Sequence, residues 1–301
     1  MRYASSARVQ SRHGLLLIML AAVLWGTVGV TTRALYSLSA TTPLSIGFFR
    51  LALATSVLLP ATWLLLGPKA LHVYRRDLAV IGLLGVMLAA YQVCYFAAIA
   101  RVGVSVAVLV TLCTAPVMVA VMSVGLHGER LTRAVLLALG CAIVGTALLV
   151  DVRLDGVTGA APLLGIALAL GSAFGYAVIT LAGRAVAGRY HPLQVTTIGF
   201  AVGALVLLPA ALATGFVVSY PPLGWALLVY LGVVPSALAY IVFLSGMRTT
   251  PATVASVVTL LEPLTGVVLA RVLFGETLGP LGIVGAALLL AALGLLYRGV
   301  R

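Results

Sequence analysis

The chain alternates between long apolar runs and short polar connections. A helix needs about 20 residues to cross the hydrocarbon core of a bilayer, and ten runs reach that length. Several begin at a helix-entry signal, as in Thr42-Pro43 and His191-Pro192. The pattern therefore predicts an all-α membrane protein with ten transmembrane helices, at residues 14–34, 43–66, 78–100, 103–125, 131–150, 162–183, 192–214, 222–246, 251–273 and 278–297.

Composition excludes a soluble protein, and the distribution of charge indicates an orientation. Apolar residues make up 63% of the 301 residues and charged residues 8%, against about 45–50% and about 25% in soluble domains. The net charge is +12, and 13 of the 18 Lys and Arg residues lie on the side that holds both termini. Four lie on the opposite side, and Arg50 lies inside the second run. The positive-inside rule thus places both termini in the cytoplasm.

The second half of the chain repeats the first. Matching positions recur at a separation of 149 or 147 residues: Trp25-Gly26 with Phe174-Gly175, Pro116 with Pro263, and Gly128-Glu129 with Gly275-Glu276. Each half, 1–155 and 156–301, contains five runs, so we expect the two halves to cross the membrane in opposite directions. Inverted repeats are typical of alternating-access transporters, whose substrate site lies near the midplane.

These motifs resemble those of the drug/metabolite transporter superfamily. The Trp-Gly of the first run, the mid-run prolines and the Gly-Glu after each fourth run are similar to the five-helix EamA unit, here present twice. Within that family the chain is most similar to the YddG-type amino-acid exporters. The resemblance implies a basket-like bundle around a central cavity that moves metabolites outward, and we expect it in a bacterial inner (plasma) membrane.

Polar and aromatic side chains near the centres of the runs are the candidate substrate-binding residues. A buried phenol or amide needs a hydrogen-bond partner that hydrocarbon does not offer. Such side chains therefore line a wet cavity or pair across helices. We assign eight positions to substrate binding: Trp25, Tyr91, Gln92, Tyr95, Thr114, Tyr176, Tyr240 and Glu262.

Two charges, Arg50 and Glu262, lie more than one helical turn from either end of their runs. A charge at that depth costs at least about 2.5–3.5 kcal/mol. Glu262 either holds a substrate ammonium group or a proton, or is a neutral carboxyl that bonds backbone groups freed by Pro263. Arg50 either bonds helix carbonyls as a structural residue or contacts a substrate carboxylate.

Other positions are expected to shape the bundle. Prolines remove a helical hydrogen bond and kink a helix, so they are candidate gating hinges, although a kink also serves packing alone. Glu129 and Glu276 are expected beside the starts of the fifth and tenth runs, where the helix dipole favours a carboxylate. Small residues recur every four positions in those two runs, which predicts close helix packing. The candidate hinges are Pro116, Pro235 and Pro263.

The sequence predicts a secondary transporter that exports aromatic or neutral amino acids, or related small metabolites, by alternating access. The alternative is a cationic-drug or nucleotide-sugar carrier of the same superfamily, but a nucleotide-sugar site needs several basic groups at depth and only Arg50 is there. The sequence has no GxxxxGK[ST] motif, no HExxH and no evident nucleophile–base cluster. We therefore expect no enzyme activity, no catalytic residue, no cofactor and no metal. The expected partners are a small-molecule substrate and the lipid bilayer, with no nucleic acid, and a monomer suffices.

Overall fold

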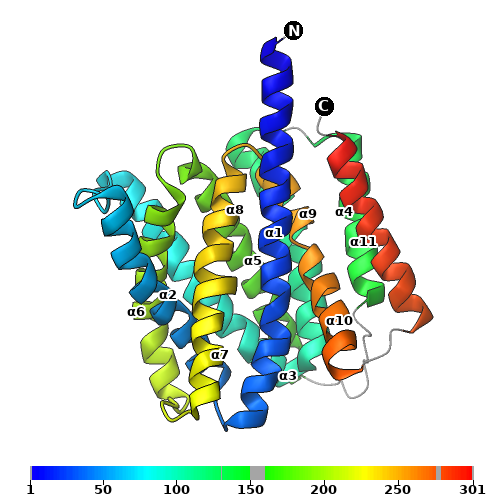
Figure 1. Ribbon diagram of the computed structural model, residues 1–301. Coiled ribbons are helices and arrows are strands. Elements are labelled where there is room, and N and C mark those ends of the chain that lie inside the picture. The colour runs from blue at the N-terminus through cyan, green and yellow to red at the C-terminus, as the bar shows by residue number, and fades with distance from the viewer. Residues whose placement is uncertain (1, 130, 150–159, 276–278, 300–301) are drawn as a thin grey trace.

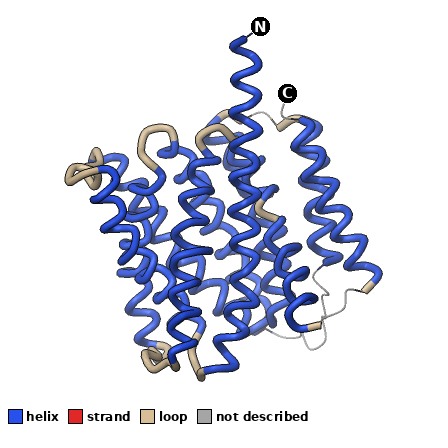
Figure 2. The backbone as a smooth tube through the Cα atoms, viewed as in Figure 1, coloured by secondary structure: helices blue, strands red, loops and turns tan. Residues whose placement is uncertain are grey.

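The computed structural model describes residues 2–129, 131–149, 160–275 and 279–299. Within these residues every regular element is a helix (Figure 2). In chain order the elements are α1 (Arg2–Leu38), α2 (Pro43–Leu66), α3 (Arg75–His127), α4 (Arg133–Leu149), α5 (Ala160–Ala187), α6 (Pro192–Ala213), α7 (Pro222–Gly232), the π-helical turn η1 (Val233–Leu238), α8 (Ala239–Met247), α9 (Ala252–Val258), α10 (Leu261–Phe274) and α11 (Pro280–Gly299).

The helices match the predicted runs. Nine helical stretches of the described chain are long and apolar enough to cross a membrane, and α4, with 17 residues, is a shorter tenth. The third and fourth runs form α3, which changes direction at Gly103, where the positive φ of 77° suits glycine. The eighth run comprises α7, η1 and α8, and the ninth comprises α9 and α10. The predicted all-α membrane fold is confirmed.

The bundle begins and ends on the same side. In Figure 1, α1 begins and α11 ends at the same end of the molecule, as an even number of crossings requires. Helix α1 packs against α8 and α10, α2 packs against α6, and α3 packs against α5 and α6. Every one of these pairs brings together helices from the two halves of the sequence. The domain boundaries at 1–155 and 156–301, and the opposite orientation of the halves, stay predictions.

Helices α4 and α11 pack together at one edge of the bundle (Figure 1). A Cβ atom added to Gly285 would lie 2.5 Å from the carbonyl oxygen of Gly145, so the two backbones touch. Ala138, Ala142 and Thr146 of the small-residue stripe are buried. The close packing predicted for the fifth and tenth runs is confirmed.

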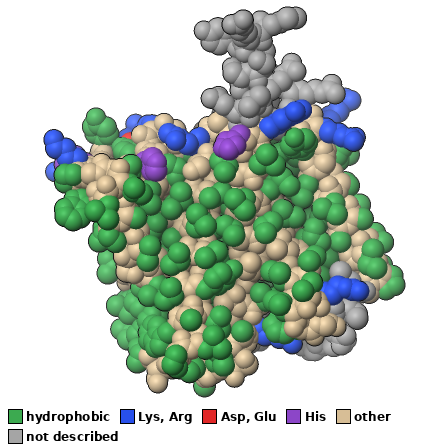
Figure 3. Space-filling model, in the orientation of Figure 1, with side chains coloured by type: hydrophobic (Ala, Val, Ile, Leu, Met, Phe, Trp, Pro, Cys, Tyr) green, Lys and Arg blue, Asp and Glu red, His purple; other side chains and the backbone are tan. Residues whose placement is uncertain are grey.

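The outer surface suits a bilayer. Figure 3 shows a broad apolar band, with the visible Lys and Arg side chains at the two ends and most of them at the end where α1 begins. Leu64 and Leu65 are 77% and 75% exposed. Large exposed apolar surfaces are unfavourable in water, whereas lipid covers them at no such cost. The protein is therefore a multi-pass membrane protein.

Candidate functional site

Six polar side chains lie deep inside the transmembrane segments of the bundle, and we call them the central site. They come from α2, α3, α5, α8 and α10. Each is partly exposed, although each lies well inside its transmembrane segment. Each of these side chains keeps some accessible surface, so the helices do not close completely around them. The central site consists of Arg50, Tyr91, Tyr95, Tyr176, Tyr240 and Glu262.

The two charges of the central site are coupled but not paired. The charge of Arg50 acts on Glu262, and both charges act on Tyr91 and Tyr240. Glu262 and Arg50 do not form an ion pair within 4.0 Å. In the described part of the chain, no hydrogen bond to the Glu262 carboxylate is found. The site therefore presents one carboxyl group without a hydrogen-bond partner among the described residues and one guanidinium group with unused donors.

Glu262 is placed by the interruption between α9 and α10. Pro263 lacks the N–H that would bond Thr259 O four residues earlier, and the Glu262 N–H donates to that oxygen at 3.0 Å instead. Helix α10 therefore starts afresh, with Glu262 and Pro263 in its first turn, where proline is tolerated. The positive end of the helix dipole favours a carboxylate at this position.

Arg50 is held by the π-helical turn η1. Pro235 has no N–H for the carbonyl of Leu231, and the hydroxyl of Ser236 donates to that oxygen at 2.7 Å. The Nε–H of Arg50 in turn donates to Ser236 Oγ at 3.2 Å. Arg50 thus binds a side chain of the eighth transmembrane segment. It does not bond helix carbonyls, which was the structural role predicted for it. Single π-helical turns are frequent at functional sites.

Tyrosines form one wall of the site. Tyr91 and Tyr95, one helical turn apart on α3, stack with their ring centroids 6.3 Å apart. The Tyr176 hydroxyl donates to Thr259 Oγ1 at 2.8 Å, and Thr259 donates to Ser256 O at 2.8 Å. This chain of bonds ties α5 to the interruption between α9 and α10.

A second aromatic group lies between α1, α6 and α8. The ring of Trp25 contacts those of Tyr240 and Phe243, each at 5.1 Å between centroids, and Tyr240 also contacts Phe200 at 5.0 Å. Trp25 is buried, and its Nε1–H has no hydrogen-bond partner among the described residues. The tilted and edge-on geometries are those that aromatic pairs prefer.

Glycines allow the helices that carry the site to approach closely. A Cβ on Gly26 would lie 2.8 Å from Glu262 O, and a Cβ on Gly175 would lie 3.0 Å from Tyr91 Cβ. These two glycines are the repeat-related ones that follow Trp25 and Phe174. Each lets the first helix of its half pack tightly against a helix of the other half.

The remaining predicted residues lie around this centre. Gln92 is buried and donates to Leu88 O at 3.2 Å, while its Oε1 is unpartnered among the described residues and points at Gly47 of α2. Thr114 is partly exposed on α3. Pro116 lies in a part of α3 with helical φ and ψ, whereas Pro235 and Pro263 lie at interruptions.

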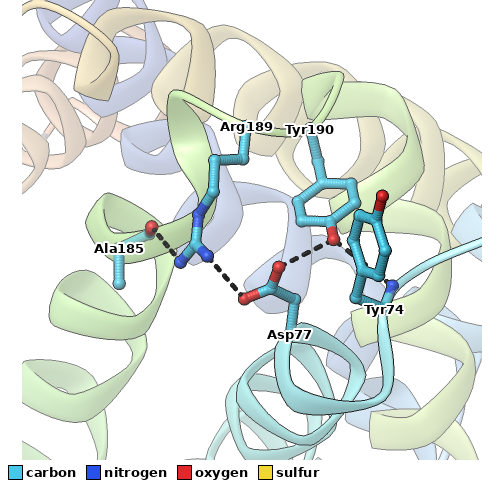
Figure 4. A network of polar contacts seen from close by, with 5 residues as sticks. All are labelled: Tyr74, Asp77, Ala185, Arg189 and Tyr190. Carbon is cyan, nitrogen blue, oxygen red and sulfur yellow. Dashed lines mark hydrogen bonds and ion pairs between the residues drawn. The ribbon is translucent and has the colours of Figure 1, made fainter.

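A polar network at one end of the bundle was not foreseen from the sequence (Figure 4). Asp77, in the first turn of α3, is 5% exposed. It accepts a hydrogen bond of 2.7 Å from the Tyr190 hydroxyl and forms an ion pair of 2.9 Å with Arg189. Desolvation, together with the hydrogen bond to Asp77, raises the pKa of Tyr190. The network joins the connection between α5 and α6 to the start of α3.

Glu129 lies at a helix N-terminus as expected, but the helix is not the one predicted. Its carboxylate accepts bonds from Ala252 N at 3.0 Å, Thr253 N at 3.4 Å and Thr253 Oγ1 at 2.8 Å. It therefore caps α9, in the other half of the chain, rather than the fifth run that follows it in sequence. The turn at Gly128, with a φ of 63°, directs the chain away from α3 at this point. Glu276 lies outside the described residues.

Comparison with known proteins gives consistent matches. The sequence profile of the EamA-like transporter family matches residues 12–151 and 163–298, once in each half of the chain. A relative named as the uncharacterized transporter YwfM of Bacillus subtilis (strain 168) is 30% identical over 282 residues, which cover 92% of this chain and 91% of the relative.

Two further similarities extend these matches. A protein named as the pseudopaline exporter CntI of Pseudomonas aeruginosa (strain UCBPP-PA14) is 30% identical over 227 residues, or 74% of each chain. A solved crystal structure aligns with a TM-score of 0.78 over 94% of this chain and 95% of its own, at 24% identity. That structure shares the fold.

Proposed function

The chain belongs to the EamA-like transporter family, and we propose that it exports amino acids or related small metabolites by alternating access. The observation that carries this proposal is the central site, where four tyrosines, Arg50 and Glu262 keep some accessible surface deep inside their transmembrane segments. Tyrosine offers both an apolar ring and a hydroxyl. Such a lining suits a small amphipathic molecule that carries charge.

The positions of the interrupted helices support a moving site. In transporters built from inverted repeats, discontinuous helices border the substrate and the two repeats move around it. Here η1 holds Pro235 next to Ser236, and α10 begins beside Pro263. We assign the hinges to these two prolines, and a lesser bend to Pro116 within α3.

Orientation and direction follow from charge and from a relative. The side that holds both termini carries 13 of the 18 Lys and Arg residues, so it faces the cytoplasm of a bacterial inner membrane in this proposal. One relative is named as an exporter, which supports outward movement. A monomer in the bilayer contains all six central residues and is sufficient for the task.

Flux through reconstituted protein tests the proposal. Purified protein in liposomes is assayed with each of the twenty labelled amino acids, and we expect saturable flux of aromatic or neutral ones. Tyr176→Phe removes the bond to Thr259 and should lower flux by about 2- to 10-fold. Tyr74→Phe is the matched control, because that side chain is 82% exposed at the start of α3. Folded protein that moves none of the twenty contradicts the amino-acid substrate.

A further inference from the structure

Arg50 is a basic side chain for which orientation gives no reason. It lies inside α2, and only its Nε–H is engaged, with Ser236 Oγ. Its two terminal nitrogens have no hydrogen-bond partner among the described residues. A guanidinium binds a carboxylate through two parallel N–H groups. Arg50 therefore retains the donors that a carboxylate requires.

Ser236 fixes the direction of the guanidinium. Its own hydrogen is donated to Leu231 O, so towards Arg50 the hydroxyl acts only as an acceptor. With Nε held there, the donors of the two terminal nitrogens remain unused among the described residues. Tyr240 lies one turn after Ser236, and its ring contacts that of Trp25 at 5.1 Å between centroids. A Cβ on Gly26, next to Trp25, would lie 2.8 Å from Glu262 O. The guanidinium therefore lies beside the helices that carry the central site.

A close helix contact sets the distance between Arg50 and Ser236. A Cβ on Gly232, one turn before Ser236, would lie 2.9 Å from Leu53 Cβ and 3.4 Å from Arg50 O. Helix α2 therefore lies directly against the end of α7. Neither contact atom is the tip of a flexible side chain, so a larger residue at position 232 has to move α2 and Arg50 with it.

Arg50 and Glu262 have no ion-pair partner among the described residues, and this imposes a condition on the ligand. A charge away from bulk water is costly unless it is paired. A ligand with only a cationic group pairs with Glu262 but leaves Arg50 unpaired and repelled, and a ligand with only an anionic group does the reverse. A ligand that carries both groups satisfies both side chains and leaves the site electrically neutral.

We infer that Arg50 binds the carboxylate of the substrate and Glu262 binds its ammonium group, so that the substrate is a zwitterion. This inference rests on the proposed transport function and narrows it. Ser236 is the positioning residue that orients Arg50. Purely cationic drugs, an alternative for this superfamily, are then poor substrates despite the carboxylate of Glu262.

Competition between matched analogues tests the inference. The transported amino acid is compared with its decarboxylated and its deaminated form, which for phenylalanine are phenethylamine and 3-phenylpropanoate. Each analogue lacks one charged group and keeps the ring. Against labelled phenylalanine flux in proteoliposomes, we expect each analogue to need a concentration at least about 10-fold higher than phenylalanine itself, since one charge-assisted contact is lost.

Variants assign the carboxylate contact to Arg50. In Arg50→Gln, phenylalanine should bind about 10- to 100-fold more weakly, and phenethylamine should then compete as well as phenylalanine. Arg50→Lys keeps the positive charge but lacks the two parallel N–H groups of the guanidinium, so its preference for phenylalanine over phenethylamine should be intermediate. If Arg50→Gln does not fold, Arg50→Lys decides, since discrimination equal to the wild type overturns the assignment.

Serine variants separate positioning from packing. Ser236→Ala should reduce the preference for phenylalanine over phenethylamine. Ser236→Thr keeps a hydroxyl group and should keep that preference. Ser245→Ala is the matched control, because Ser245 on α8 donates only to Ile241 O of its own helix. The inference is overturned if phenethylamine competes as well as phenylalanine in the wild type. Absence of any amino-acid flux by folded protein instead contradicts the proposed function.

Discussion

Replacement of Glu129 by alanine removes the carboxylate that caps α9. Two of its three bonds have good lengths, 3.0 Å to Ala252 N and 2.8 Å to Thr253 Oγ1, and the third is long at 3.4 Å. Loss of an N-terminal cap costs about 0.5–2 kcal/mol, and loss of the carboxylate from the helix dipole adds about 0.3–1 kcal/mol. We therefore expect Glu129→Ala to destabilise the protein by about 2 kcal/mol.

Thermal unfolding of the purified protein measures this cost. A change of 1 kcal/mol shifts Tm by about 2–4 °C in domains of 150–250 residues, so Glu129→Ala should lower Tm by about 4–8 °C. Thr253→Val removes only the hydroxyl bond and should lower it by about half as much. Since α9 leads to Thr259 and Glu262, amino-acid flux should fall as well. An unchanged Tm in Glu129→Ala, or a larger shift in Thr253→Val, refutes the reasoning.

Three further predictions concern helix contacts and the polar network. Gly285→Val places side-chain atoms against a carbonyl oxygen of α4, at a position where a Cβ alone would lie 2.5 Å from that oxygen. Overpacking of this kind costs about 1–3 kcal/mol, so Gly285→Val should lower Tm. Gly294→Val, where a Cβ has no neighbour within 4 Å, should leave Tm unchanged. Asp77→Asn should lower Tm more than Arg189→Gln, because Asp77 is buried, whereas Arg189 is 57% exposed and exposed ion pairs contribute about 0–1 kcal/mol. The raised pKa of Tyr190 means that the folded protein holds the phenol proton more tightly than the unfolded chain does. Stability should therefore fall as pH rises above about 10. When Tm is measured over a pH series, Tyr190→Phe should show a smaller fall than the wild type.

The transmembrane helices were predictable because the signal for each is local. A run of apolar residues of sufficient length has to satisfy its own backbone hydrogen bonds in lipid, whatever its neighbours are. The residues that mark the starts of helices also act on groups only two or three positions away. Thr42 Oγ1 accepts from Ser45 N at 3.2 Å, and His191 Nδ1 accepts from Leu193 N at 3.3 Å, which caps α2 and α6 where the sequence predicts their starts.

The centre of the bundle was predictable only in part. Depth in a run identifies Tyr91, Tyr176 and Glu262 as residues in need of polar surroundings, but it does not say which helices meet. Arg50 was left between two roles because its partner, Ser236, is 186 positions away. One signal was present, since Pro235 leaves a carbonyl unpaired in mid-membrane and a serine follows it directly.

Contacts at the ends of the helices could not be predicted from the sequence pattern. Glu129 was assigned to the helix that follows it, because dipole arguments consider neighbours along the chain, whereas it caps a helix 123 positions away. Asp77 and Tyr190 are 113 positions apart, and their bond depends on how two connections pack. Such pairs are determined by the three-dimensional arrangement of the bundle and not by hydropathy or spacing.

Counterflow in proteoliposomes tests the central claim, transport of amino acids through one site that opens alternately to each side. Liposomes that contain the protein are loaded with unlabelled phenylalanine at high concentration and diluted into a trace of labelled phenylalanine. A carrier with a single alternating site predicts that the label rises transiently above its equilibrium level, because internal substrate returns the site to the outside. Entry of label without such an overshoot contradicts alternating access, and no entry at all contradicts phenylalanine as a substrate.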